Sequence, residues 1–185
     1  MRAKEPSARS ARRPLLMVDI DGVISLFGCF PSSALPAPHC GDLDGSFHTI
    51  DGIPHFLSRA AAGHLLLLAR DFDLVWCSGW EEKAEEYLPS LLGLPAGLPF
   101  LRFARMTGRP PTRLTNAHWK LDAITAHAGG RPLAWIDDAF NPACHAWALE
   151  RPAPTLLVQT EPEHGLTARE AQQLQEWVQA LPAGA

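Results

Sequence analysis

The sequence has few cysteines, no long hydrophobic run and no strong excess of either charge sign. Its 185 residues include four widely spaced cysteines, no two of them in a C-x-x-C pattern, and a formal net charge of -4. No stretch approaches the roughly 18 uninterrupted apolar residues of a transmembrane helix. Charge alone therefore does not indicate a general binder of nucleic acid or membrane surfaces. The cysteine usage favours a reducing compartment, and we expect a cytoplasmic location. A bridge between Cys29 and Cys40 is the alternative.

The first 13 residues also lack an apolar segment. They are basic and rich in Ser and Ala, without the apolar stretch of a secretory signal. Their short length and Glu5 argue against a transit peptide. We expect a disordered basic tail over residues 1–13. A single domain over residues 14–182 should follow, because a chain of this length can bury a substantial core.

Two acids follow the most apolar short run near the start of the chain. Residues 15–18, LLMV, show no alternation, which predicts a strand covered on both faces. Asp19 and Asp21 come next, and carboxylates at the end of a buried strand are costly unless a cation or a reaction needs them. In open α/β sheets, ligands bind beyond the carboxyl ends of the strands. The pair therefore indicates a functional site, with an ordinary Asp-Gly turn as the alternative.

The rest of the chain alternates strand-like and helix-like segments. We expect further strands at residues 74–78, 98–103, 133–136 and 155–159. We expect helices at residues 54–70, in the stretch after Gly79, and at residues 116–128, 141–150 and 167–181. Thr167 and Glu170 have the spacing of a capping box at the start of the last helix. This alternation predicts an α/β fold with a central parallel sheet of about five strands, covered by helices on both faces.

Further polar residues are expected at the same edge of the sheet. Ser78 ends one strand, Asp137 and Asp138 end another, and Lys120 lies on the helix that precedes it. Four carboxylates in one pocket would repel each other, and a Mg²⁺ ion and a lysine would compensate. Each residue has a simpler interpretation: Ser78 as a helix cap, Lys120 as a surface lysine, the acidic pair as a turn. Their combination in this order favours the functional interpretation.

These motifs resemble those of the haloacid dehalogenase (HAD)-like hydrolase superfamily. DIDGV at residues 19–23 is similar to the first motif of that superfamily, and Ser78, Lys120 and the acidic pair match the second, third and fourth. The segments VWCSGWEEKAEE, HWKLDAI and RPLAWIDDAF resemble more narrowly the HAD domain of Swiss Army Knife RNA repair proteins. The resemblance covers nearly the whole chain and implies a three-layer α/β/α Rossmann-like fold.

The resemblance also implies a role for each site residue. Asp19 would be the nucleophile that forms an aspartyl-phosphate, and Asp21 would protonate the leaving oxygen and later activate water. Ser78 would bind a phosphoryl oxygen, and Lys120 would neutralise charge. The implied Mg²⁺ ligands are Asp19, the backbone carbonyl of Asp21, and Asp137, Asp138 or both.

The implied activity is Mg²⁺-dependent hydrolysis of a phosphomonoester, with a nucleic-acid end or nucleotide as one substrate class. A small-metabolite phosphatase, a phosphotransferase and a non-catalytic phosphate- or nucleic-acid-binding module on the same fold are the alternatives. Residues 24–50, rich in Gly, Pro and Ser, predict a loop or small hairpin. This insertion is too short for a separate cap domain. It resembles the cap-less class and would form a flap or minimal cap.

One stretch bears on the substrate. Residues 87–121 contain no Asp or Glu but include Arg102, Arg105, Arg109, Arg113 and Lys120. A basic rim would favour a polyanionic substrate such as a nucleic-acid end. The alternative is a surface loop that balances the acidic residues at 81–86. We expect substrate contacts from Gly79, Trp80, Arg105 and Arg109. The aromatic residues Trp80, Phe100, Phe103 and Trp119 could stack on a base, although such residues more often belong to a core.

Overall fold

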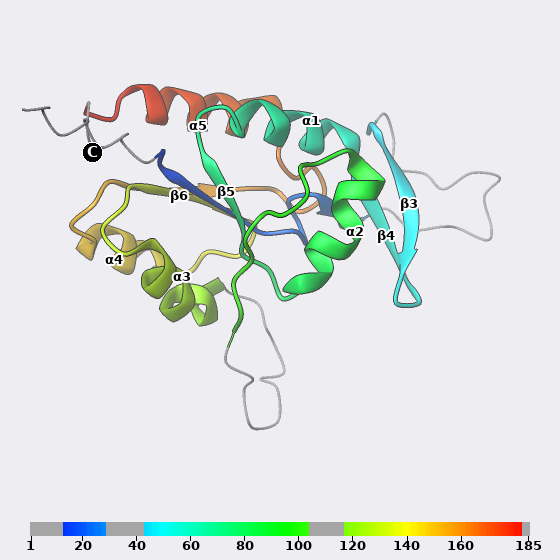
Figure 1. The fold of residues 1–185 in the computed structure, drawn as a ribbon, viewed down its shortest axis with the longest axis horizontal. Coiled ribbons are helices and arrows are strands. Elements are labelled where there is room, and N and C mark those ends of the chain that lie inside the picture. Colours follow the sequence, from blue (N-terminus) through cyan, green and yellow to red (C-terminus); the bar gives the residue numbers. More distant parts are fainter. Residues whose placement is uncertain (1–12, 29–42, 104–116, 183–185) are drawn as a thin grey trace, which may run out of the picture.

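Four parallel strands form the central sheet of this protein. The computed structural model describes residues 13–28, 43–103 and 117–182. The strands are β1 (Leu15–Val18), β5 (Asp73–Trp76), β6 (Leu133–Asp137) and β7 (Thr155–Gln159). They pair in the order β5-β1-β6-β7, each with its neighbour in parallel (Figure 1). The parallel sheet is confirmed, and within the described residues it has one strand fewer than predicted.

Helices cover both faces of this sheet, which gives the three layers that the sequence predicts (Figure 1). On one face lie α1 (Arg59–Leu68) and α5 (Ala168–Gln179), and on the other lie α3 (Leu121–Ala128) and α4 (Pro142–Glu150). α2 (Glu82–Leu92) contributes buried residues to the same core as α1 and α5.

The position of β1 inside the sheet explains why its sequence is apolar throughout. Leu16 and Val18 belong to the core beneath α1 and α5, whereas Leu15 and Met17 belong to the core on the α3 and α4 side. Successive side chains of a strand point to opposite faces, so a strand covered on both faces needs apolar residues at every position. The unbroken LLMV run is therefore a consequence of the two covering layers.

Two predicted elements differ in the structure. Residues 98–103 do not form a strand, because only Phe100 bridges to the sheet, at Trp76. The predicted helix at 54–70 begins later, because Ile53–Ser58 is the strand β4. Pro54 fits the first turn of a helix, but its fixed φ also fits a strand where no N–H is needed. Ser58 is the actual helix cap, and its Oγ accepts a hydrogen bond from the Ala61 N–H at 3.1 Å.

The insertion after β1 contributes to a second, smaller sheet. β2 (Ser25–Leu26) and β3 (Gly45–Ile50) both pair antiparallel with β4, in the order β2-β4-β3. The hairpin of β3 and β4 stands beside α1 and α2 at one end of the molecule (Figure 1). Residues 29–42 of the predicted flap lie outside the described residues.

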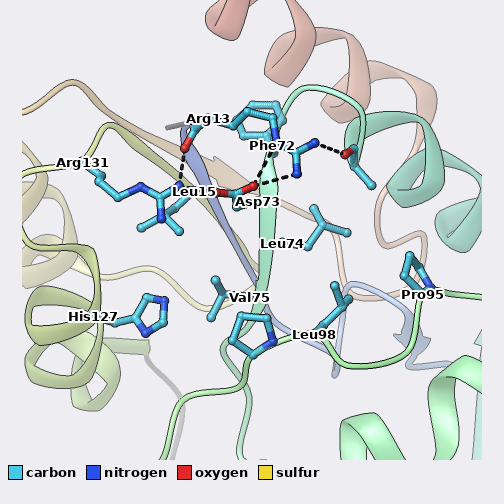
Figure 2. A pocket seen from close by; sticks show the side chains of 12 residues that line it. Arg13, Leu15, Phe72, Asp73, Leu74, Val75, Pro95, Leu98, His127 and Arg131 are labelled. Atoms are coloured by element: carbon cyan, nitrogen blue, oxygen red, sulfur yellow. Dashed lines mark hydrogen bonds and ion pairs between the residues drawn. The ribbon is translucent and has the colours of Figure 1, made fainter. Parts of the chain in front are cut away.

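Ion pairs fix the start of β1 and β5 (Figure 2). Arg13 Nε donates to Asp73 Oδ1 at 3.0 Å, and Arg131 ion-pairs with the other carboxylate oxygen of Asp73. These residues line a cleft of about 400 Å³ that also includes Leu15 and His127 (Figure 2). Because β1 begins here and ends just before Asp19, this cleft lies at the opposite end of the sheet from Asp19.

The described residues include two of the four cysteines. Cys77 and Cys144 are buried thiols without a disulfide, whereas Cys29 and Cys40 lie outside the described residues. Among the helices of the described part, none has the length and apolar character needed to cross a membrane.

Candidate active site

The neighbouring strands β1 and β6 bring three carboxylates together. Val18 and Ile136 are paired in register, and the Asp19 N–H donates to the Ile136 carbonyl at 3.1 Å. Asp19, Asp137 and Asp138 each offer an oxygen, and these oxygens lie within 4.8 Å of one another. We call these three residues the carboxylate cluster. Its all-oxygen donor set is the kind that Mg²⁺ prefers, so the residues present fit this metal.

Lys120 joins two members of the cluster. Its Nζ lies 2.7 Å from Asp19 Oδ2 and 2.6 Å from Asp137 Oδ2, and the residue is 3% exposed. It ends the short 3₁₀ helix η1 (Ala117–Lys120), directly before α3. Burial alone would lower the pKa of Lys120, but the charges of Asp19 and Asp137 outweigh it and raise the pKa above its ordinary value. Lys120 is therefore a buried cation, not the surface lysine of the simpler interpretation.

The two acids after β6 have raised pKa values. Burial is the largest cause for both, followed by the charge of Asp19, and the pKa of Asp138 reaches about 6. Asp137 is completely buried, and its Oδ1 accepts a hydrogen bond from the Ala139 N–H at 3.0 Å. The carboxylates thus repel each other even with Lys120 present, and a bound divalent cation would relieve this repulsion.

Asp21 lies apart from the cluster and faces different partners. Its Oδ2 accepts a hydrogen bond from the indole N–H of Trp80 at 3.0 Å. Burial, and next the charge of Asp19, raise the pKa of Asp21 above its ordinary value. A raised pKa favours the protonated carboxyl, which is the form that a general acid needs.

Ser78 lies just beyond β5, next to the end of β1. The Cys77 N–H donates to the Val18 carbonyl at 2.7 Å, so the pairing of the two strands continues to this point. Ser78 is 2% exposed, and its Oγ has one long contact of 3.5 Å with the Trp80 N–H. It does not cap α2, whose N-cap is Glu81. The simpler interpretation of Ser78 is therefore wrong.

A family model describing the HAD domain in Swiss Army Knife RNA repair proteins matches residues 15–171. The chain belongs to this family. The matched range contains the carboxylate cluster, Asp21, Ser78 and Lys120, and the membership makes the chain a domain of the HAD hydrolase type. A comparison with curated proteins gave no match.

Of the four residues expected to contact the substrate of this HAD domain, the structure describes two. Gly79 is exposed and Trp80 half-buried, and both follow Ser78 directly. Arg105 and Arg109 lie outside the described residues, so their role stays a prediction. Arg102 ion-pairs with Glu82 at 3.2 Å. The charge of Arg102 is thus balanced by one of the acidic residues at 81–86, as the alternative to a basic rim predicts.

The aromatic residues near the site of the HAD domain form two groups. Phe103 and Trp119 pack edge to face at 4.5 Å between ring centroids, and Lys120 Nζ lies 5.4 Å from the Trp119 ring. In the second group, His55 packs edge to face against Trp80 at 4.8 Å. Base stacking by these side chains stays a prediction.

Sequence reasoning missed His55. His55 lies on β4. Its Nδ1 is 2.9 Å from Ser25 Oγ and 4.0 Å from Asp21 Oδ1. The predicted helix at 54–70 included His55 and so gave it no place beside Asp21. The only local signal was the Asp51-Gly52 turn before residues 53–58, a turn that also fits a hairpin between two strands. Only the pairing of β4 with β2 brings His55 to the site.

Gly22 is required by the close packing of the site. Its φ is +73°, and an added Cβ would lie 2.4 Å from Asp138 Oδ2. Its N–H donates to the Ser25 carbonyl at 2.8 Å, and its carbonyl accepts from Thr160 Oγ1 at 2.8 Å. The turn after β1 is therefore held against Asp138, and a side chain here would displace that carboxylate.

We expect Gly22→Ala to weaken metal binding. The added methyl group moves the Asp138 carboxylate, and displaced groups around a metal typically cost about 10–100-fold in affinity. Mg²⁺ affinity measured by isothermal titration calorimetry checks this. Gly97→Ala is the matched control, because Gly97 also has a positive φ, +83°, but an added Cβ meets nothing within 4 Å. Equal Mg²⁺ affinity in the two variants would contradict the expectation.

Proposed function

We propose that this HAD domain is a Mg²⁺-dependent phosphomonoester hydrolase that works through an aspartyl-phosphate on Asp19. The observation that carries the proposal is the carboxylate cluster with Lys120 buried between Asp19 and Asp137, at 2.7 and 2.6 Å. Family membership supports a hydrolase of this type. Buried carboxylates at this density are costly in a protein that does not use them.

The chain's own residues supply each proton and bond change of the reaction. A carboxylate oxygen of Asp19 forms a bond to phosphorus while the bond from phosphorus to the leaving oxygen breaks, and Asp21 gives its proton to that oxygen. Asp21 then takes a proton from a water molecule, whose oxygen attacks phosphorus and releases phosphate and Asp19. Lys120 would offset the negative charge of Asp19 before the reaction and of the phosphoryl group after it, and Ser78 would donate its hydroxyl to a phosphoryl oxygen.

The carboxylate cluster and the backbone carbonyl of Asp21 would hold the metal. When bound, Mg²⁺ would offset the negative charge of the phosphoryl group and of the surrounding carboxylates.

For the substrate we propose a phosphorylated nucleic-acid end. The family takes its description from RNA repair proteins, and residues 87–121 of this chain carry basic but no acidic side chains. Phosphate-rich ligands are attracted by such a segment. A small phosphorylated metabolite is the competing substrate class. The cytoplasmic location expected from the cysteine usage stays a prediction.

The proposal is tested by release of inorganic phosphate from a set of substrates, with Mg²⁺ and with EDTA. The set contains p-nitrophenyl phosphate, small phosphorylated metabolites, and oligonucleotides that carry a 5′- or a 3′-phosphate. We expect Mg²⁺-dependent release, fastest from an oligonucleotide. Faster release from a metabolite would overturn the substrate class but keep the reaction. Absence of release from every substrate would overturn the reaction and favour a binding module.

A further inference from the structure

The side chain of Asp21 is held by residues that lie outside the four family motifs. The indole N–H of Trp80 donates to Asp21 Oδ2 at 3.0 Å. An indole N–H can only donate, so Oδ2 must act as an acceptor whether or not the carboxyl carries a proton. This hydrogen bond holds the carboxyl group in one orientation, with Oδ1 4.0 Å from His55 Nδ1.

The indole itself is fixed from the small antiparallel sheet. His55 on β4 packs edge to face against the Trp80 ring, with 4.8 Å between centroids. His55 Nδ1 lies 2.9 Å from Ser25 Oγ on β2. The backbone of Ser25 in turn forms an isolated β-bridge with Asp21. A closed set of contacts thus runs from Asp21 through Trp80, His55 and Ser25 back to Asp21.

We propose that Trp80 is a positioning residue for Asp21, braced by His55, and that its hydrogen bond holds the carboxyl group of Asp21 in the orientation that serves the leaving oxygen of the substrate. The inference rests on the proposed role of Asp21 as general acid. A carboxyl group can rotate about its Cβ–Cγ bond, and a hydrogen bond to one oxygen removes this freedom before the reaction begins. Such preorganisation is worth most when the proton transfer limits the rate.

A comparison of substrates with different leaving groups distinguishes a positioning role of Trp80 from a substrate-stacking or a purely structural role. An alkoxide leaves poorly without a proton, whereas p-nitrophenolate leaves readily without one. A misdirected Asp21 therefore slows an alkyl phosphate much more than p-nitrophenyl phosphate. A substrate-stacking role would change KM, and a purely structural role would affect both substrates equally.

The experiment compares kcat/KM of Trp80→Phe for an alkyl phosphate and for p-nitrophenyl phosphate. Phe keeps a ring against His55 but removes the N–H donor. We expect kcat/KM to fall about 10–100-fold for the alkyl phosphate, a part of the roughly 10²–10⁴-fold that acid–base catalysis contributes, and less than about threefold for the aryl phosphate. The fall should be in kcat. An equal loss with both substrates, or a change in KM alone, overturns the proposal.

Trp147→Phe is the matched control. It makes the same substitution and also removes one indole hydrogen bond, from Trp147 Nε1 to Thr125 Oγ1 at 2.9 Å. Trp147 packs on the α3 and α4 side of the sheet, away from Asp21. We expect an unchanged ratio of the two kcat/KM values. A changed ratio here would show that the readout does not report on Asp21 and would overturn the inference.

Two further variants keep the test decisive. Asp21→Asn removes the acid itself, and we expect the same preference, only larger. If Asp21→Asn lowers kcat/KM equally for both substrates, the acid role in the proposed function fails and the positioning role fails with it. If it shows the preference and folded Trp80→Phe does not, only the positioning role fails. Should Trp80→Phe not fold, His55→Leu removes the brace and carries the test. It is expected to shift the ratio in the same direction by a smaller factor, and an unchanged ratio overturns the proposal.

Discussion

Asp19→Asn is expected to abolish Mg²⁺-dependent phosphate release while the domain stays folded. An amide oxygen is a far weaker nucleophile than a carboxylate, so the aspartyl-phosphate cannot form. We expect activity to fall by at least about 10³-fold, since removal of a nucleophile in other enzymes costs as much or more. Asn has the shape of Asp, and Lys120 keeps its contact with Asp137 at 2.6 Å. Phosphate release and thermal unfolding, measured on the same preparation, check both parts.

Asp73→Asn is the matched control for this variant. Asp73 is also a paired acid at a strand end, but it lies at the opposite end of the sheet with Arg13 and Arg131 (Figure 2). Its substitution is expected to leave phosphate release within about twofold of the unsubstituted protein, because no charge near Asp19 changes. Near-normal activity in Asp19→Asn would rule out Asp19 as the nucleophile.

Lys120→Met is expected to destabilise the domain strongly when no divalent cation is present. Methionine has a similar length but leaves Asp19 and Asp137 facing each other without a buried cation. Removing one partner of a buried ion pair costs about 3–5 kcal/mol in free energy of unfolding. Added Mg²⁺ should restore part of this loss, because it binds the folded state and supplies positive charge. Urea unfolding in EDTA and in Mg²⁺ measures both effects.

Lys83→Met is the comparison for the Lys120 variant. Lys83 also forms an ion pair, with Asp51, but both side chains are largely exposed to solvent. Surface pairs contribute little, since water solvates each charge alone. We expect almost no change in stability and no response to Mg²⁺ beyond that of the unsubstituted protein. Equal stability of the two variants in EDTA would show that the cluster does not depend on the charge of Lys120.

The sequence predicted much of the fold because local patterns and tertiary packing agree there. The apolar runs at β1, β6 and β7 are strands, and Thr167 with Glu170 forms the expected capping box at α5. Prediction failed at residues 54–58, where Pro54 fits a helix start as well as a strand. Pairing with β2 and β3 decided between the two. The Asp51-Gly52 turn fits a hairpin of β3 and β4, but the pairing with the distant β2 leaves no pattern in the sequence.

The candidate site also contains residues that could be placed from the sequence and a residue that could not. Asp19, Asp137 and Asp138 could be placed together from the sequence, because parallel strands end at one edge of their sheet. The sequence placed Lys120 on the segment before β6, whereas its ion pairs depend on how that segment packs beside the ends of β1 and β6. His55 could not be placed, since its proximity to Asp21 depends on how the small antiparallel sheet packs against the end of β1.

The sequence by itself therefore determined the layers of the fold and the acids at the strand ends, because hydrophobic period and residue type are local properties. Only the tertiary structure decided which acid faces which partner. Asp19 and Asp137 form ion pairs with Lys120, whereas Asp21 accepts a hydrogen bond from Trp80 and lies near His55. The physical reason is that these contacts join segments far apart in the chain, and the packing of β4 and α3 against the central sheet fixes them.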